Sequence, residues 1–176
     1  MSEGLTLGTV MLEESIETFR SMKKLGDRTL EQLEETQFHA ALDPESNTME
    51  VIIRHMHGNM LSRWTDFLHS DGEKPTRDRD GEFVEAGASR ESLLALWEEG
   101  WAAVFGTLAS LRPEDLLRTV TIRGEAHTVV KAIQRQVSHY GYHVGQMVFL
   151  GKHLRSSDWQ TLSIARGQSR AFRPGT

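Results

Sequence analysis

The stretch VVKAIQRQVSHYGYHVGQMVFLGKHL, residues 129–154, has the clearest helical pattern in the chain. At about 100° per residue, its large apolar side chains cover about half of a helical cylinder: Val129, Ile133, Val137, Tyr140, Val144, Met147, Leu150 and Leu154. A helix with one apolar half buries that half against other elements. The pattern therefore predicts one long amphipathic helix in an all-α protein.

Three further stretches repeat apolar residues at intervals near three and four. They predict helices over residues 7–38, 47–68 and 89–110, with Ser89 as a helix N-cap. Four helices of this length with mostly short connections predict a four-helix bundle, and we expect one domain over residues 1–176.

Other local signals concern the segments within and between these helices. Gly26 and Asp27 are expected to bend or fray the first helix. RTVTIRGEAHTV, residues 118–129, alternates apolar and polar side chains around Gly124, which predicts a short hairpin before the last helix. A short helix is expected over residues 158–165, followed by a basic, irregular tail.

The connection between the second and third predicted helices contains SDGEKPTRDRDGEF, residues 70–83, and is long for a link between packed helices. Its acidic residues resemble a calcium loop. An EF-hand would need an acidic residue at its first and twelfth positions, where Thr76 and Gly87 stand. The segment DRDGE is therefore interpreted as solvated charge.

Composition restricts the class of function. A net charge of −5 argues against nucleic acid or an anionic membrane as the main partner. The chain has no cysteine, which excludes thiolate nucleophiles, disulfides and Cys-ligated zinc. No apolar run approaches the roughly 18 residues of a membrane span, and MSEGLTLGTVMLEES lacks the pattern of a signal peptide. A cytoplasmic protein is expected.

His139 and His143 lie four residues apart on the last predicted helix, so both side chains point the same way. They stand at the border of the apolar half, where a side chain can enter a cleft and still meet water, as an open metal site requires. Two partly exposed helix histidines are the alternative. Tyr140 follows the first histidine, so the pair is not the HExxH motif of metalloproteases.

A third metal ligand could come from RHMHGNM, residues 54–60. His55 and His57 are about 200° apart on a helix, so both cannot face one ion. His55 shares a border position with Asn59 and is preferred, while His57 stays open as its substitute. The remaining histidines have ordinary explanations at helix ends or in the hairpin: His39, His69, His127 and His153.

HMHGNMLSRW, residues 55–64, followed later by HYGYHVGQMVFLGK, residues 139–152, resembles the DinB-like or YfiT-like family. The resemblance extends from the first helix through Leu154. It implies a four-helix bundle of the DinB/YfiT type in which three histidines hold a divalent metal ion, most readily zinc or nickel. It also implies a homodimer.

Carried over to this chain, the family's three metal ligands fall on His55, His139 and His143. Gln146 matches the glutamine that follows the second histidine of the pair. Three imidazoles leave an incomplete shell on zinc or nickel, which solvent or a small-molecule thiol can complete. Characterised relatives include thiol-dependent S-transferases and a mycothiol-dependent isomerase, so the resemblance implies transfer of a low-molecular-weight thiol to an electrophile.

Several polar residues near these histidines are candidates for contacts to the ligands or the substrate: Asn59, Asp66, Arg135, Tyr140 and Gln146. Two alternative functions stay open. One is a hydrolase that uses metal-activated water, which needs a nearby general base. The other is a non-catalytic, metal-binding dimer related to stress, whose interface would use tryptophans and the outward-facing Phe149.

Overall fold

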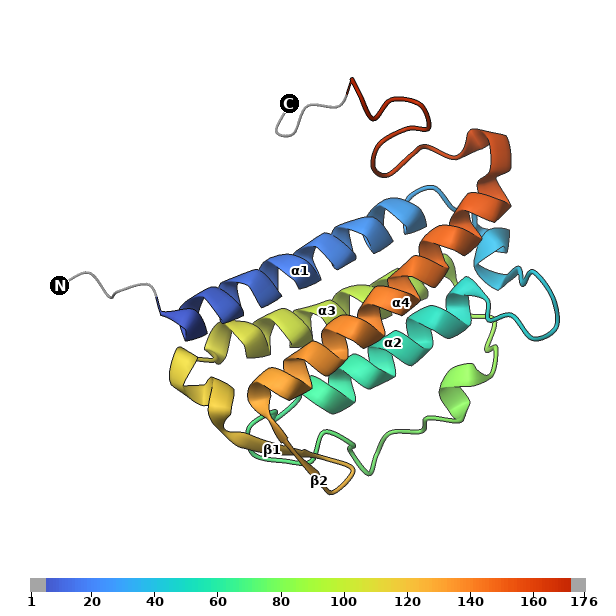
Figure 1. Ribbon diagram of the computed structural model, residues 1–176. Helices are drawn as coiled ribbons and strands as arrows, with labels where there is room; N and C mark the ends of the chain where they lie inside the picture. The colour runs from blue at the N-terminus through green and yellow to red at the C-terminus, as the bar shows by residue number, and fades with distance from the viewer. Residues whose placement is uncertain (1–5, 172–176) are drawn as a thin grey trace.

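The computed structural model describes residues 6–171, so the ends of the two terminal stretches considered above lie outside the described residues. Its long helices are α1 (Leu7–Leu30), α2 (Met49–Trp64), α3 (Arg90–Ser110) and α4 (Val129–Arg155). The hairpin strands are β1 (Thr119–Ile122) and β2 (Glu125–Thr128), and the 3₁₀ segments are η1 (Glu35–His39), η2 (Gly81–Phe83), η3 (Pro113–Leu117) and η4 (Ser156–Asp158). The four helices pack lengthwise, and the hairpin precedes α4 at one end (Figure 1). The mainly helical fold and the hairpin are therefore confirmed.

Hydroxyl side chains fix where each helix begins. The Oγ atoms of Thr6, Thr48, Ser89 and Thr128 each accept a hydrogen bond from the backbone amide three residues later. Such a cap satisfies one of the amides that a helix leaves without an internal partner. The expected cap at Ser89 is confirmed.

The helix ends differ from the sequence expectation. α1 ends at Leu30 rather than near residue 38, because Glu34 and Gln37 form a capping box that starts η1 and turns Phe38 into the core. α2 ends at Trp64 rather than near residue 68, and Asp66 has a left-handed φ of 48° that cannot continue a helix. The helix expected over residues 158–165 is absent, since only η4 touches that range.

Gly26 does not bend α1, contrary to expectation. The helix runs through it, and a Cβ at this position would overlap the ring of Trp97 on α3. The indole Nε1 of Trp97 then donates to Oδ1 of Asp27 at 2.7 Å. The glycine therefore allows close helix packing.

One aromatic side chain from each long helix meets at the centre of the core. Phe19 of α1 packs against Trp64 of α2 and Trp101 of α3 with ring centroids 5.8 and 6.3 Å apart, and Tyr140 of α4 lies 5.7 Å from Trp101. All four side chains are almost completely buried. Because Tyr140 follows His139 directly, this cluster also fixes the part of α4 that carries the histidine pair. Within residues 6–171, no helix has the length and apolar content needed to cross a membrane.

Candidate metal centre

His55 of α2 meets His139 and His143 of α4 where these two helices lie side by side (Figure 1). One ring nitrogen from each histidine lies within 4.8 Å of the other two. His55 and His143 are about 5% exposed, and His139 is half-buried. The structure thus brings together the three histidines that the sequence singled out.

His57 points away from this cluster. Its Nε2 lies 2.9 Å from Oε2 of Glu99 on α3, and its side chain lines a different pocket on the other side of α2. This follows from the turn of about 200° between positions two apart on a helix. The structure therefore offers His55 rather than its alternative as the third ligand.

Two of the three imidazoles are oriented by hydrogen bonds at Nδ1. Glu82 Oε2 lies 3.0 Å from Nδ1 of His55, and Gln146 Oε1 lies 2.8 Å from Nδ1 of His143. Burial raises the pKa of Glu82, but hydrogen bonds from Arg77 and His55 outweigh it and lower this pKa below its ordinary value. An ionised carboxylate only accepts hydrogen bonds, so Nδ1 of His55 donates and Nε2 keeps its lone pair.

The histidine pair on α4 is held neutral. Burial, followed by the charges of neighbouring histidines, lowers the pKa of His139 to about 3. Burial and His55 lower the pKa of His143 to about 4. Both imidazoles are therefore uncharged at neutral pH, the form in which histidine binds a metal ion.

The nitrogens of His55 and His139 have the separation expected for two ligands of one divalent cation. Nε2 of His55 and Nε2 of His139 are 3.2 Å apart, close to the roughly 3.3 Å between two nitrogens bound to a tetrahedral zinc ion at about 2.0–2.1 Å. Nε2 of His143 and Nδ1 of His139 are buried without a hydrogen-bond partner in the described part of the chain. An orphaned buried lone pair is costly, and a cation would satisfy the one on His143.

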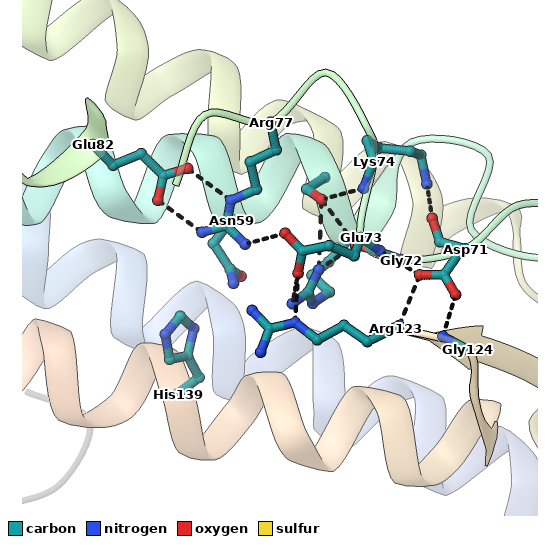
Figure 2. A network of polar contacts seen from close by, with 12 residues as sticks. Asn59, Asp71, Gly72, Glu73, Lys74, Arg77, Glu82, Arg123, Gly124 and His139 are labelled. Atoms are coloured by element: carbon teal, nitrogen blue, oxygen red, sulfur yellow. Dashed lines mark hydrogen bonds and ion pairs between the residues drawn. The ribbon is translucent and has the colours of Figure 1, made fainter. Parts of the chain in front are cut away.

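The long connection between α2 and α3 supplies the orientation of His55. Glu82 is 7% exposed, and Arg77 donates to both of its carboxylate oxygens at 2.7 Å (Figure 2). Gly58 on α2 admits this contact, because a Cβ there would overlap the Glu82 carboxylate. The interpretation of DRDGE as solvated charge holds for the exposed residues 78–80 and is wrong for Glu82.

Sequence reasoning missed Glu82, Arg77 and Gly58. Glu82 and Arg77 belong to a segment with no helical or alternating period, so the sequence assigns them no face. Gly58 lies on α2, and the sequence does not show which side chain from another segment approaches it. The unusual length of the connection was the only signal.

The candidate centre opens into a pocket of about 440 Å³. Rings stand beside it: the ring of Phe83 lies 4.8 Å from that of His55, and the ring of Tyr142 lies 4.2 Å from that of His143. This setting leaves room for a small molecule next to the three histidines.

The family model that matches this chain is described as "protein of unknown function (DUF1572)" and covers residues 6–168. The chain belongs to the DUF1572 family. No curated protein matches it.

The other candidate residues of this DUF1572 protein have separate places. Asn59 and Arg135 line the pocket, and Gln146 binds His143. Asp66 lies instead at the pocket on the other side of α2. Tyr140 is completely buried: its hydroxyl accepts from Nε1 of Trp64 at 2.9 Å and donates to Oδ1 of Asn59 at 3.1 Å. Its place is structural.

Proposed function

We propose that this DUF1572 protein binds one divalent metal ion, zinc or nickel, through His55, His139 and His143. The site would activate a small-molecule thiol for transfer to an electrophile. The observation that carries the proposal is the convergence of three imidazoles with available lone pairs at the edge of an open pocket. The resemblance to the DinB-like or YfiT-like family adds the thiol as the expected substrate.

The reaction would form one carbon–sulfur bond and break one bond to a leaving group. A bound divalent ion lowers the pKa of a thiol, so that the sulfur is present as the nucleophilic thiolate. The thiol proton would pass to solvent, the sulfur would attack the electrophilic carbon, and the leaving group would depart with its electron pair. The chain has no cysteine, so the sulfur comes from the small molecule.

The residues around the histidines would keep the ligands in place. Glu82 orients the His55 ring and raises its basicity, as carboxylates behind metal-binding histidines do. Arg77 holds Glu82 by a two-point contact. Gln146 fixes the tautomer of His143.

The pocket favours thiol chemistry over hydrolysis. A hydrolase that uses metal-activated water needs a general base beside the ion. Among the described residues that line the pocket there is no aspartate or glutamate, and Glu82 is already engaged by Arg77 and His55. A non-catalytic metal-binding dimer is the second candidate, because Phe149 is 66% exposed on α4.

Metal content measured by elemental analysis on untagged protein tests the site. We expect about one ion per chain in the wild type, loss of the ion in His55→Ala, and retention in His57→Ala, which removes a histidine two positions away. Wild-type protein that stays free of metal after incubation with zinc and nickel would overturn the proposal. Equal metal content in wild type and His55→Ala would do the same.

A further inference from the structure

Arginine is the most frequent residue around the pocket beside the three histidines. Five contribute to its lining: Arg63, Arg77, Arg79, Arg123 and Arg135. Within residues 6–171, the only carboxylates that pair with them are Glu73 and Glu82. The five guanidinium charges against two carboxylates leave an excess of three positive charges at this pocket of an acidic protein.

Two of the arginines are buried and ion-paired. The side chains of Arg63 and Arg77 are 5% and 4% exposed, and each is ion-paired with Glu73. Arg77 is also ion-paired with Glu82 (Figure 2). They are part of the scaffold and make the inner wall of the pocket positive. Their charges help to lower the pKa of His139, after burial and the neighbouring histidines.

The other three arginines have donors to spare. Arg79 and Arg135 are exposed, and neither has an ion pair or hydrogen bond with another residue in the range 6–171. Arg123 uses Nε to bind Glu73 at 2.9 Å, and its two terminal amino groups have no partner among the same residues. Guanidinium groups with free terminal nitrogens bind carboxylates and phosphates at two points.

Arg123 also has a left-handed backbone conformation, which residues other than glycine rarely adopt. It forms the two-residue turn of the hairpin with Gly124, and both have left-handed φ values, 57° and 75°. Asparagine or glycine is the usual first residue of such a turn. Asp71 locks the turn by accepting hydrogen bonds from both backbone amides at 2.8 Å.

This turn directs the Arg123 side chain along α4 toward His139 (Figure 2). Strained residues that the surrounding structure holds in place cluster at functional sites. The locked turn therefore fixes the Arg123 side chain beside this pocket.

We propose that the pocket binds a small organic acid. Its carboxylate or phosphate group is held by Arg79, Arg123 and Arg135, and its reactive end faces the three histidines. This inference rests on the proposed function and names its substrate class: the thiol or its acceptor carries a negative charge. Phe83 and Tyr142 supply ring surfaces for the carbon skeleton.

Three probes on the nickel-loaded protein test the inference: 2-mercaptoethanol as a neutral thiol, mercaptosuccinate as an acidic thiol, and succinate as an acid without sulfur. Thiol binding is followed by the thiolate-to-nickel absorbance band, and succinate binding by calorimetry. We expect Arg123→Gln and Arg135→Gln each to weaken the binding of mercaptosuccinate or succinate about tenfold. This is the effect of losing one charged hydrogen bond. The affinity for 2-mercaptoethanol should not change.

Arg20→Gln is the matched control, since it removes one positive charge from an exposed position on α1 that does not line the pocket. Metal content and thermal unfolding check each variant. Arg135 has no ion pair in the described range, so its variant should fold normally. Weaker succinate binding in the pocket variants would place the negative charge on the acceptor as well. Weaker binding of mercaptosuccinate alone would place the negative charge on the thiol.

Different results would overturn the organic-acid pocket and the proposed thiol activation. If both pocket variants bind the two acids as the wild type does, the organic-acid pocket is overturned, while a band with 2-mercaptoethanol still supports thiol activation. If neither thiol produces a band on metal-loaded protein, thiol activation is overturned. Succinate affinity that depends on Arg123 and Arg135 would then still support the acid pocket.

Discussion

Glu82 reaches across Gly58 to His55, and its Oε2 lies 3.0 Å from Nδ1 of that ring. The glycine sits one helical turn from the histidine, on the side of α2 that the connection covers. A side chain at position 58 would occupy the space of the carboxylate. The orientation of one candidate metal ligand thus depends on the absence of a side chain elsewhere on the same helix.

Gly58→Ala should weaken metal binding without unfolding the protein. The new methyl group would displace the flexible end of Glu82, and His55 would lose the partner that sets its tautomer. Loss of such a partner typically costs about 10–100-fold in metal affinity. Competition with a chromogenic chelator measures the affinity, and circular dichroism checks the helices.

Gly106→Ala is the control for this variant. Gly106 lies on α3, and a Cβ there would meet no atom within 4 Å. Alanine stabilises a helix interior by roughly 0.5–1 kcal/mol relative to glycine, so this variant should be slightly more stable and bind metal as the wild type does. Wild-type affinity in Gly58→Ala would show that Glu82 does not orient His55.

Tyr140→Phe should lower stability and leave metal content unchanged. Its hydroxyl joins the buried Nε1 of Trp64 to Oδ1 of Asn59, and removing it leaves both atoms without that partner at a cost of about 2 kcal/mol. Urea unfolding measures the loss. Tyr142→Phe, at a residue 52% exposed, should change stability by less than about 0.5 kcal/mol. Loss of metal in Tyr140→Phe would instead assign this tyrosine to the metal centre.

The sequence predicts those features of the site that depend on helical period. The four-residue spacing of His139 and His143, and the border position of His55, follow from 3.6 residues per turn, and the structure brings these side chains together. Features set by contacts between distant segments escape such reasoning. The expectation that Gly26 disturbs α1 is wrong because the glycine makes room for Trp97. That partner is on another helix, so the period of α1 does not reveal it.

The arginines that line the pocket also depend on contacts between distant segments, which the sequence pattern does not predict. Arg77 belongs to an irregular connection without a period. Arg123 belongs to the turn of the hairpin, where the alternation of the strands does not assign a face. Arg135 was a candidate because it is on α4. Only the packing of the connection and the hairpin beside α2 and α4 brings all three to one pocket.

Stability of the metal-free protein should fall as the pH drops from about 6.5 to about 4. Histidine has an ordinary pKa of 6.5, whereas burial and neighbouring charges lower the pKa values of His139 and His143 to about 3 and about 4. In this window the unfolded chain binds more protons than the folded chain, so acid favours unfolding. Above the window both states are neutral and the effect vanishes.

Urea unfolding at about pH 7 and about pH 4.5 should therefore show a loss of at least about 2 kcal/mol for the metal-free protein. The double variant His139→Gln and His143→Gln removes both titrating groups and should lose less over the same interval. An equal loss in wild type and double variant would assign the acid sensitivity to other groups.

Arg123→Asn should separate stability from binding. Asparagine followed by Gly124 is the favoured pair for a turn with two left-handed residues, and a left-handed conformation costs an ordinary residue about 1–2 kcal/mol. Loss of the half-exposed ion pair with Glu73 offsets part of the gain, because such pairs contribute about 0–1 kcal/mol. We expect the variant to be as stable as the wild type or up to about 1 kcal/mol more stable, and to bind mercaptosuccinate about tenfold more weakly. Thermal unfolding and the nickel absorbance band measure the two effects on the same sample. A variant that loses stability and keeps its affinity would show that Arg123 serves the fold rather than the ligand.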